Sequence, residues 1–262
     1  MPILIMTKVE CRLAKPYQHY CKIIKILQGI TVFLYQPTSG YCYNSDSIFL
    51  YDFISSFKPK GKLLDVGCGV GIISLLLSRD FSVETSIIDK QEVMLNYAKH
   101  NYVLNGLEAQ SYLGDFTVFG TQERYDYIIS NPPFYDENVQ QSEHTNLNIA
   151  RYAQHLPIEH FIKHVKMLLR PKGWFIFCYD AKQIDLLLYY LKLNGINPEK
   201  IQFVHSKIDR ESKLVMIAAR NNSKSMTKVL PPFVVFDEHN VYRPHVKKIF
   251  DKAQTHSIKG DF

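Results

Sequence analysis

The chain has 262 residues, 46% of them hydrophobic, and a formal net charge of +6 at pH 7. This length fits one large domain or one domain with an appendage, and the mild basicity permits a polyanionic partner without requiring one. Because its five cysteines form no CxxC pair and no apolar run approaches the ~20 residues of a membrane span, we expect a cytoplasmic protein with reduced thiols, no structural zinc and no membrane segment.

Residues 1–28 carry five basic side chains against one acid, Glu10. This excess is typical either of a solvated leader or of a basic arm that binds nucleic acid, and we favour the leader. The apolar start, Met1 to Met6, is short and has no basic segment before it, so it does not predict a signal peptide. We therefore treat 1–28 as a basic leader that need not be ordered.

Residues 29–60 predict a small N-terminal extension. Ile30 to Tyr43 is rich in β-branched and aromatic residues around Pro37–Gly40, which indicates a β-hairpin. Asn44–Ser47 offers an N-cap, and Ile48 to Phe57 is helical in pattern. We expect this hairpin and helix to cover one mouth of the domain that follows.

The stretch around which the chain is organised is Asp65-Val-Gly-Cys-Gly-Val-Gly71, between an apolar run and a helical pattern. It predicts a strand, a glycine turn (Gly67, Gly69, Gly71) and a helix, where missing Cβ atoms let backbone lie against a nucleotide. A dinucleotide site needs a later third glycine and binds pyrophosphate. The Asp65 carboxylate would instead repel phosphate and attract an ammonium group, which favours S-adenosylmethionine. A tight turn without a ligand is the alternative.

Two further acids follow predicted strands. Asp89 ends the strand Ser82–Ile88, about 20 residues beyond the glycines, where an acid is expected to accept ribose hydroxyls. The alternative is an N-cap for the next helix, Glu92–Asn105, and the two roles can coexist. Asp115 follows the strand Ser111–Gly114 and is a candidate acceptor for an adenine amine, or a surface turn residue.

A second motif, Asn131-Pro132-Pro133-Phe134-Tyr135, follows the apolar strand Tyr125–Ser130. The two prolines hold the chain extended and remove two amide donors. The Asn131 side-chain oxygen and the Pro132 carbonyl can then act as paired acceptors for an –NH2 group on a planar ring, with Phe134 as a flat apolar face. The alternative is an ordinary loop that contains two prolines.

The remaining sequence predicts continued alternation of helices and strands. After a polar loop, Asp136 to Ile149, the expected elements are helix Ile158–Leu169, strand Trp174–Cys178, helix Ile184–Leu193, a closing hairpin of Ile201–Val204 and Leu214–Ala219, an edge strand Phe233–Phe236 and a helix His245–Ala253. Basic residues near the hairpin turn are candidate phosphate contacts: Lys207, Arg210 and Lys213. The histidines do not cluster with one another or with cysteines, so no metal is expected.

Asp65–Gly71, Asp89 and Asn131–Phe134 together resemble class I S-adenosylmethionine-dependent methyltransferases that modify exocyclic or amide nitrogens. The resemblance implies an α/β fold: a Rossmann-like seven-stranded sheet with helices on both faces. Residues 61–221 would form this core, with a small N-terminal hairpin and helix extension before it and a strand and helix appendage, 222–262, after it.

Three other stretches are similar to the bacterial tRNA(Val) adenine-N(6)-methyltransferase family: Gln36–Asp46, Ala150–Tyr152, and Phe233–Phe250 with Tyr242. This resemblance implies methylation of an adenine amine in tRNA beside the anticodon, with Asn131, Pro132, Pro133 and Phe134 catalytic. Asp65, Gly67, Gly69, Gly71, Asp89 and Asp115 would bind the cofactor, and Tyr135, Arg151, Lys207, Arg210 and Lys213 the RNA.

Other substrates are compatible with the same residues. The second motif also suits a guanine amine of ribosomal RNA or a protein glutamine amide, and Phe134 stands where some adenine enzymes carry Tyr. A nucleotide-binding module or NAD-dependent enzyme is disfavoured by the glycine spacing and by the Asn-Pro-Pro-Phe motif. We expect a monomer.

Overall fold

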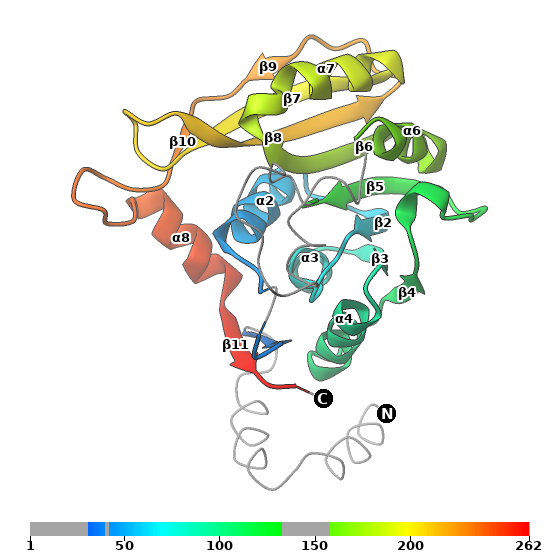
Figure 1. Cartoon of the computed structure of the whole chain (residues 1–262), viewed down its shortest axis with the longest axis vertical. Helices are drawn as coiled ribbons and strands as arrows, with labels where there is room; N and C mark the ends of the chain where they lie inside the picture. The colour runs from blue at the N-terminus through cyan, green and yellow to red at the C-terminus, as the bar shows by residue number, and fades with distance from the viewer. Residues whose placement is uncertain (1–30, 40–41, 133–157, 262) are drawn as a thin grey trace, which may run out of the picture.

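The computed structural model describes residues 31–39, 42–132 and 158–261, and its main element is a twisted nine-stranded sheet (Figure 1). The strand order is β10-β7-β8-β6-β5-β2-β3-β4, and β9 pairs with β7. These strands are β2 (Gly61–Val66), β3 (Val83–Asp89), β4 (Gln110–Leu113), β5 (Tyr125–Ser130), β6 (Leu169–Asp180), β7 (Ile196–His205), β8 (Ser212–Asn221), β9 (Lys228–Val229) and β10 (Phe233–Val234).

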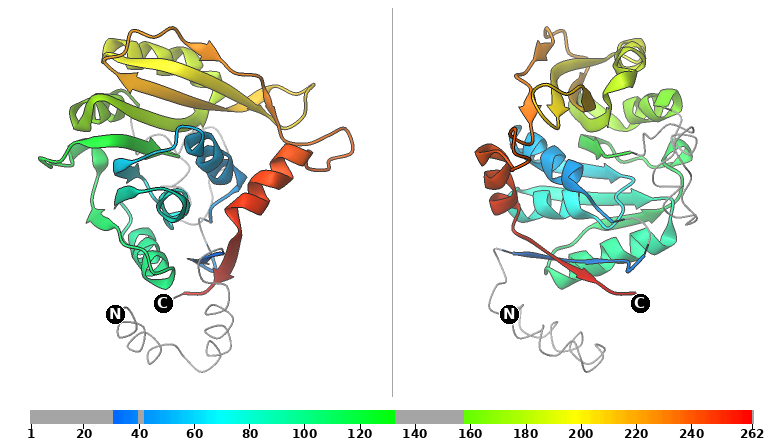
Figure 2. Two further views of the ribbon diagram at one scale, coloured as in Figure 1. Left: turned by 180° about the vertical axis from the view of Figure 1, so that it is seen from behind. Right: turned by 60° about the vertical axis from the view of Figure 1, so that its left-hand side comes forward.

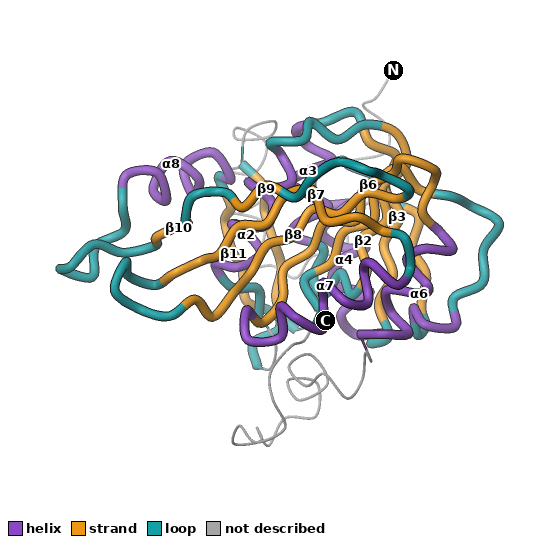
Figure 3. Tube along the Cα trace, turned by 90° about the horizontal axis from the view of Figure 1, so that it is seen from above, coloured by secondary structure: helices purple, strands orange, loops and turns teal. Residues whose placement is uncertain are grey.

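Helices cover both faces of this sheet. The helices are α2 (Ser45–Ser55), α3 (Ile72–Asp80), α4 (Glu92–Leu104), α6 (Ile158–Leu168), α7 (Ile184–Leu193) and α8 (Pro244–Ala253). Seen from above, α6 and α7 follow one face of the sheet and α3 lies on the other (Figure 3). The buried strand residues between them are almost all apolar, including Leu63, Leu64, Ile128, Phe175 and Phe177, as expected of parallel strands covered on both sides.

The strand order fixes where a ligand site can form. From β2 the chain proceeds outward through β3 to β4, then returns to the other side of β2 as β5 and β6, all parallel. β8 runs antiparallel between β6 and β7. The order therefore reverses between β2 and β5, and ligands of open α/β sheets bind outside the carboxyl ends of the strands at such a point.

The predicted N-terminal hairpin is wrong in its second strand. Residues 32–36 form β1, whose partner is β11 (Thr255–Lys259) at the other end of the chain. The two strands are parallel, from Val32 opposite Thr255 to Gln36 opposite Lys259, and lie side by side in Figure 2. β-Propensity identified the first strand, but the partner lies more than 200 residues away in sequence, and β11 was not predicted at all.

Helix α4 attaches this small sheet to the core. The Asn101 side chain accepts a hydrogen bond from Tyr35 N (2.7 Å) and donates to Tyr35 O (3.0 Å) and Val70 O (2.9 Å). One turn later, Asn105 makes the corresponding pair of bonds to the backbone of Phe33. Two asparagines on one helical face therefore satisfy the backbone groups of β1 that β11 does not pair.

Most other predicted elements are confirmed within one to three residues at each end. Helix α2 begins at Ser45, and the Asn44 side chain accepts a hydrogen bond from Asp46 N (3.1 Å), so the predicted N-cap is confirmed. The predicted strand Trp174–Cys178 is the middle of a longer strand, β6. The pairing of β6 with β5 shifts in register between Tyr125 and Tyr127. The sequence pattern does not indicate this shift.

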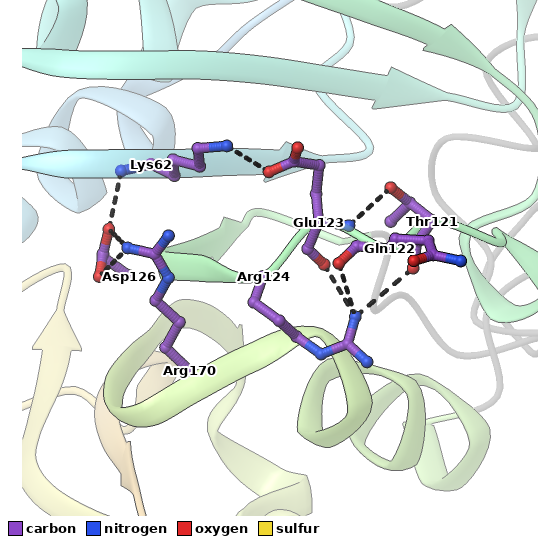
Figure 4. A network of polar contacts seen from close by, with 7 residues as sticks. All are labelled: Lys62, Thr121, Gln122, Glu123, Arg124, Asp126 and Arg170. Carbon is purple, nitrogen blue, oxygen red and sulfur yellow. Dashed lines mark hydrogen bonds and ion pairs between the residues drawn. The ribbon is translucent and has the colours of Figure 1, made fainter.

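Charged side chains bind the strands together at the amino edge of the sheet, opposite the carboxyl ends (Figure 4). The Asp126 carboxylate accepts hydrogen bonds from Lys62 N (2.9 Å) and from the Arg170 guanidinium (2.8 Å), and Lys62 pairs with Glu123. These groups are partly exposed, so each pair adds little stability. The network joins side chains of β2, β5 and β6 at this edge.

We predict that Asn101→Ala destabilises the protein by roughly 2–4 kcal/mol, because it leaves buried backbone groups of Tyr35 and Val70 unpaired. Chemical denaturation followed by circular dichroism measures the loss. Asn96→Ala, at an exposed position of the same helix, is the matched control and should change stability by less than about 0.5 kcal/mol. Equal effects of the two substitutions would contradict the role given to Asn101.

Candidate active site

A narrow cavity lies at the carboxyl edge where the strand order reverses. It is lined by the glycine turn, by Asp65 near the end of β2, by Asn131 directly after β5, by Tyr43 just before α2, and by Ser47 in the first turn of α2. Val66 and Ser130 are partners in the β2–β5 register, and Ser130 Oγ donates to Val66 O (2.7 Å). The structure therefore brings the two sequence motifs together.

The glycine turn adopts backbone conformations that favour glycine. Gly67, Gly69 and Gly71 all have positive φ, of 66°, 54° and 82°. A Cβ on Gly67 would meet no described heavy atom within 4 Å, so the turn presents bare backbone on that side. On Gly71 a Cβ would lie 3.2 Å from the Ala98 Cβ, which shows that this glycine allows α3 and α4 to pack closely.

Asp65 is a buried carboxyl group with an unused acceptor. Its side chain is 1% exposed, and its Oδ2 has no hydrogen-bond partner among the described residues. Burial raises the pKa of Asp65 to about 6, with the nearby Asp89 charge adding to the rise and Ser74 hydrogen bonds opposing it. A buried carboxylate with a free oxygen is stabilised by a cation, and the α-ammonium of S-adenosylmethionine fits this requirement.

Asp89 organises the glycine turn from the neighbouring strand. One carboxylate oxygen accepts from Gly69 N (2.8 Å) and the other from Gln91 N (2.8 Å), the N-cap residue of α4. Burial raises the pKa of Asp89 above its ordinary value despite these bonds. Each carboxylate oxygen can accept more than one hydrogen bond, so the acid can support the turn and still accept ribose hydroxyls.

Asp115 occupies a more ordinary position. Its Oδ1 accepts from Thr117 N (2.8 Å) and Thr117 Oγ1 (2.7 Å), and its Oδ2 lies 3.7 Å from Lys90 Nζ. Partial burial raises the pKa of Asp115, but these bonds and the Lys90 charge outweigh it and hold the pKa below its usual value. Gly114 N donates to Asp89 O (3.0 Å), so Asp115 follows directly beside Asp89. The role of an adenine contact stays a prediction.

The Asn131 side chain lies between two elements that the sequence motif does not contain. Its Nδ2 donates to Ser47 Oγ at 3.1 Å, and its Oδ1 accepts from the Cys178 thiol at 2.9 Å. Pro132 is buried beside it. Sequence reasoning missed Ser47 and Cys178 as members of this site. Cys178 could have been found from strand order, since Ser130 pairs with Phe177 and the following residues therefore face each other.

The other predicted site residues divide into two groups. Pro133, Phe134, Tyr135 and Arg151 lie outside the described residues. Lys207 and Arg210 lie in the turn between β7 and β8, and Lys213 in the first residues of β8. Because β7 is parallel to β6, this turn is at the same edge of the sheet as Asn131. Lys207 Nζ donates to Glu238 O (3.0 Å), and Arg210 and Lys213 are exposed.

Residues 46–183, just over half of the chain, match the family described as "Methyltransferase small domain". The chain belongs to this family. Its membership confirms the predicted enzyme class, an S-adenosylmethionine-dependent methyltransferase, and the predicted cofactor, S-adenosyl-L-methionine. Asp65 and the open side of Gly67 are the features of this structure that suit that cofactor.

The chain is similar to curated relatives named tRNA1(Val) (adenine(37)-N6)-methyltransferase. The protein from Aliivibrio fischeri is 27% identical over 56% of this chain and 64% of its own length. The protein from Flavobacterium johnsoniae is 24% identical over 76% of this chain and 86% of its own. The match thus spans less than two thirds of the first relative and most of the second.

Two other comparisons concern different proteins. Ribosomal RNA small subunit methyltransferase C from Actinobacillus pleuropneumoniae is 35% identical, but only over 34% of this chain and 27% of that protein. Among solved structures, a predicted O-methyltransferase from Agrobacterium tumefaciens has a TM-score of 0.61 at 12% identity, covering 81% of this chain and 98% of that one. The second likeness confirms the class I methyltransferase fold and carries no information on substrate.

Neither a metal centre nor a membrane helix is found in the part of the chain that the structure describes. In ranges 31–39, 42–132 and 158–261, no group of three or more His, Cys, Asp or Glu side chains could hold a metal ion. Within the same ranges, no helix has the length and apolar character needed to cross a membrane.

We predict that Asp65→Asn stabilises the cofactor-free protein at pH 7.5 by about 1–3 kcal/mol. The folded-state pKa, about 6, is above the unfolded value of 3.8, so ionisation of Asp65 costs stability increasingly as the pH rises from 3.8 to 6. The gain should therefore shrink at pH 5. Denaturant unfolding at both pH values measures it, with exposed Asp209→Asn as the control. A gain that does not depend on pH would contradict the assignment.

Proposed function

We propose that this methyltransferase transfers a methyl group to the exocyclic amine of an adenine in tRNA, beside the anticodon. The observation that carries the proposal is the position of Asn131. Its side chain lines the same cavity as the glycine turn and the unpartnered carboxylate oxygen of Asp65. A group suited to hold an amine is therefore adjacent to a group suited to hold the cofactor.

The cofactor-binding residues have separable roles in this proposal. S-adenosylmethionine supplies an electrophilic methyl group on its sulfonium. Asp65 would hold the α-ammonium, because its buried carboxylate has an acceptor oxygen available and gains stability from a cation. Asp89 would accept the ribose hydroxyls, and the backbone of Gly67, Gly69 and Gly71 would lie against the nucleoside.

Asn131 and Pro132 would prepare the amine for reaction. The lone pair of an adenine amine is delocalised into the ring, so the amine is a weak nucleophile. Acceptance of its two hydrogens by the Asn131 side-chain oxygen and the Pro132 carbonyl would localise the lone pair. No side-chain base is needed before transfer, since the methylated ammonium is acidic and loses its proton to water. Positioning and complementary charge would provide most of the rate.

The RNA substrate is supported by two observations. Two relatives that this chain matches over 67% and 86% of their own length have names that specify a tRNA adenine. Lys207, Arg210 and Lys213 lie at the sheet edge that holds Asn131, where phosphate contacts would orient the RNA. Arg151 would add a further phosphate contact, and Phe134 or Tyr135 would stack on the target base after it leaves its stack.

A guanine amine of ribosomal RNA is the second candidate. The small-subunit methyltransferase C relative has the higher identity, 35%, but the match covers about a quarter of that protein. A protein glutamine amide has no supporting relative among those described above. A tRNA substrate implies a cytoplasmic location, and we propose that the chain acts as a monomer.

The direct test incubates the full chain with labelled S-adenosylmethionine and either unmodified tRNA or small-subunit ribosomal RNA, and then analyses the nucleosides by mass spectrometry. We expect N6-methyladenosine in tRNA. N2-methylguanosine in ribosomal RNA alone would replace the proposal by the second candidate. Asn131→Ala should keep cofactor affinity in calorimetry and lose about 10²–10³-fold or more in turnover. Normal turnover in that variant would exclude the amine-binding role.

We also predict that the triple substitution Lys207→Ala, Arg210→Ala and Lys213→Ala raises the KM for tRNA at least tenfold with little change in the KM for the cofactor. The slope of log affinity against log salt should fall by about one for each phosphate that the variant no longer neutralises. The control removes three exposed lysines elsewhere, Lys60, Lys99 and Lys163. If the control weakens tRNA binding as much as the triple variant, the β7–β8 turn has no special role.

A further inference from the structure

The side-chain amide of Asn131 is held in one orientation by residues from two other elements. Ser47, near the start of α2, accepts a hydrogen bond from Nδ2, and Cys178, near the end of β6, donates its thiol hydrogen to Oδ1. Both residues are buried, Ser47 at 3% exposure and Cys178 at 0%. The adjacent strands β5 and β6 and the first turn of α2 thus converge on one side chain.

The orientation matters because the two ends of the amide are chemical opposites. Oδ1 is an acceptor with two lone pairs, and Nδ2 is a donor. The proposed function, on which this inference rests, requires Oδ1 to face the amine, since an amine offers hydrogens. If the amide rotated by 180°, it would present a donor to a donor. The bond from Cys178 uses one lone pair of Oδ1 and leaves the other for substrate.

Cys178 is the partner that distinguishes the two orientations. The Ser47 hydroxyl can donate or accept, so it tolerates either end of the amide. A thiol is a weak donor, but burial raises the pKa of Cys178 well above its ordinary value, with the Asp46 charge adding to the rise, so the thiol keeps its proton. The neutral thiol has a hydrogen to donate, whereas its sulfur is only a weak acceptor, so it favours Oδ1 over Nδ2 as its neighbour.

We propose that Cys178 is a positioning residue for methyl transfer: together with Ser47, its thiol fixes the Asn131 amide with the carbonyl oxygen available to the substrate amine. Cys178 does not touch substrate and provides no nucleophile. Its contribution is to remove the rotational freedom of Asn131 before the substrate binds. The role applies to adenine and guanine amines alike, because both offer the same –NH2 group.

The test compares Cys178→Ala with Cys178→Ser. Loss of one hydrogen bond of about 1 kcal/mol predicts a kcat about fivefold lower in Cys178→Ala, with the KM for S-adenosylmethionine unchanged. Cys178→Ser keeps a donor and should remain within about twofold of the native enzyme. Ile176→Val removes a buried methyl group from the same strand and should leave kcat unchanged. Equal kcat in Cys178→Ala and native enzyme would overturn the proposal.

A second measurement separates positioning from general loss of packing. In an Asn131→Ala background, Cys178→Ala should produce no further decrease in kcat, because there is no amide left to orient. Additive effects would show that Cys178 acts by another route. The two outcomes are independent of which RNA is methylated, so a result in favour of a guanine amine would correct the proposed function without deciding this inference.

A structural measurement covers the case in which none of the tested RNAs is methylated. In protein labelled with 15N-asparagine, the Asn131 side-chain NH2 should give two well-separated, slowly exchanging resonances, assigned by their loss in Asn131→Ala. We expect both to shift and to exchange faster in Cys178→Ala and to recover in Cys178→Ser. Unchanged resonances in Cys178→Ala would overturn the proposal, whereas absence of methylation would count only against the proposed function.

Discussion

The hydrogen-bonded register between β2 and β5 is the constraint on which the site depends. Residues 63–66 of β2 pair with residues 127–130 of β5. At the carboxyl end of this pairing, Ser130 Oγ donates a hydrogen bond to Val66 O. A shift of one residue would reverse every side chain between the two faces of these strands. Because the register is held, the glycine turn and the Asn-Pro motif leave the sheet side by side, although about 60 residues of chain separate them.

Burial of charge is the second feature that determines how the site works. Asp65 and Asp89 are both almost fully enclosed, and burial raises the pKa of each. Asp89 offsets part of this cost with two backbone hydrogen bonds, one of which shapes the glycine turn. Asp65 has one oxygen without such a partner among the described residues. The fold thus keeps a buried acceptor whose instability a cationic ligand relieves.

The two ends of the described chain pair with each other and contact a residue that lines this site. β11 pairs with β1, and the Tyr43 hydroxyl, beside the cavity, lies 3.1 Å from Thr255 Oγ1. Tyr43 N also donates to Gln36 Oε1 (2.9 Å), at the end of β1. The C-terminal strand therefore contacts Tyr43, which lies four residues before Ser47, and Ser47 in turn accepts a hydrogen bond from Asn131.

The sequence by itself determined the α/β class, nearly all helices and strands of the core, and the two motifs that meet at the cavity. These follow from local properties of the sequence: the spacing of its apolar residues, glycines at turn positions, and polar residues directly after a strand. Only the tertiary structure decided that β1 pairs with β11, that Asp89 binds the backbone of the turn, and that Ser47 and Cys178 hold Asn131. Each of these contacts joins residues between 20 and more than 200 positions apart, and no local pattern records which distant group will complete a hydrogen bond.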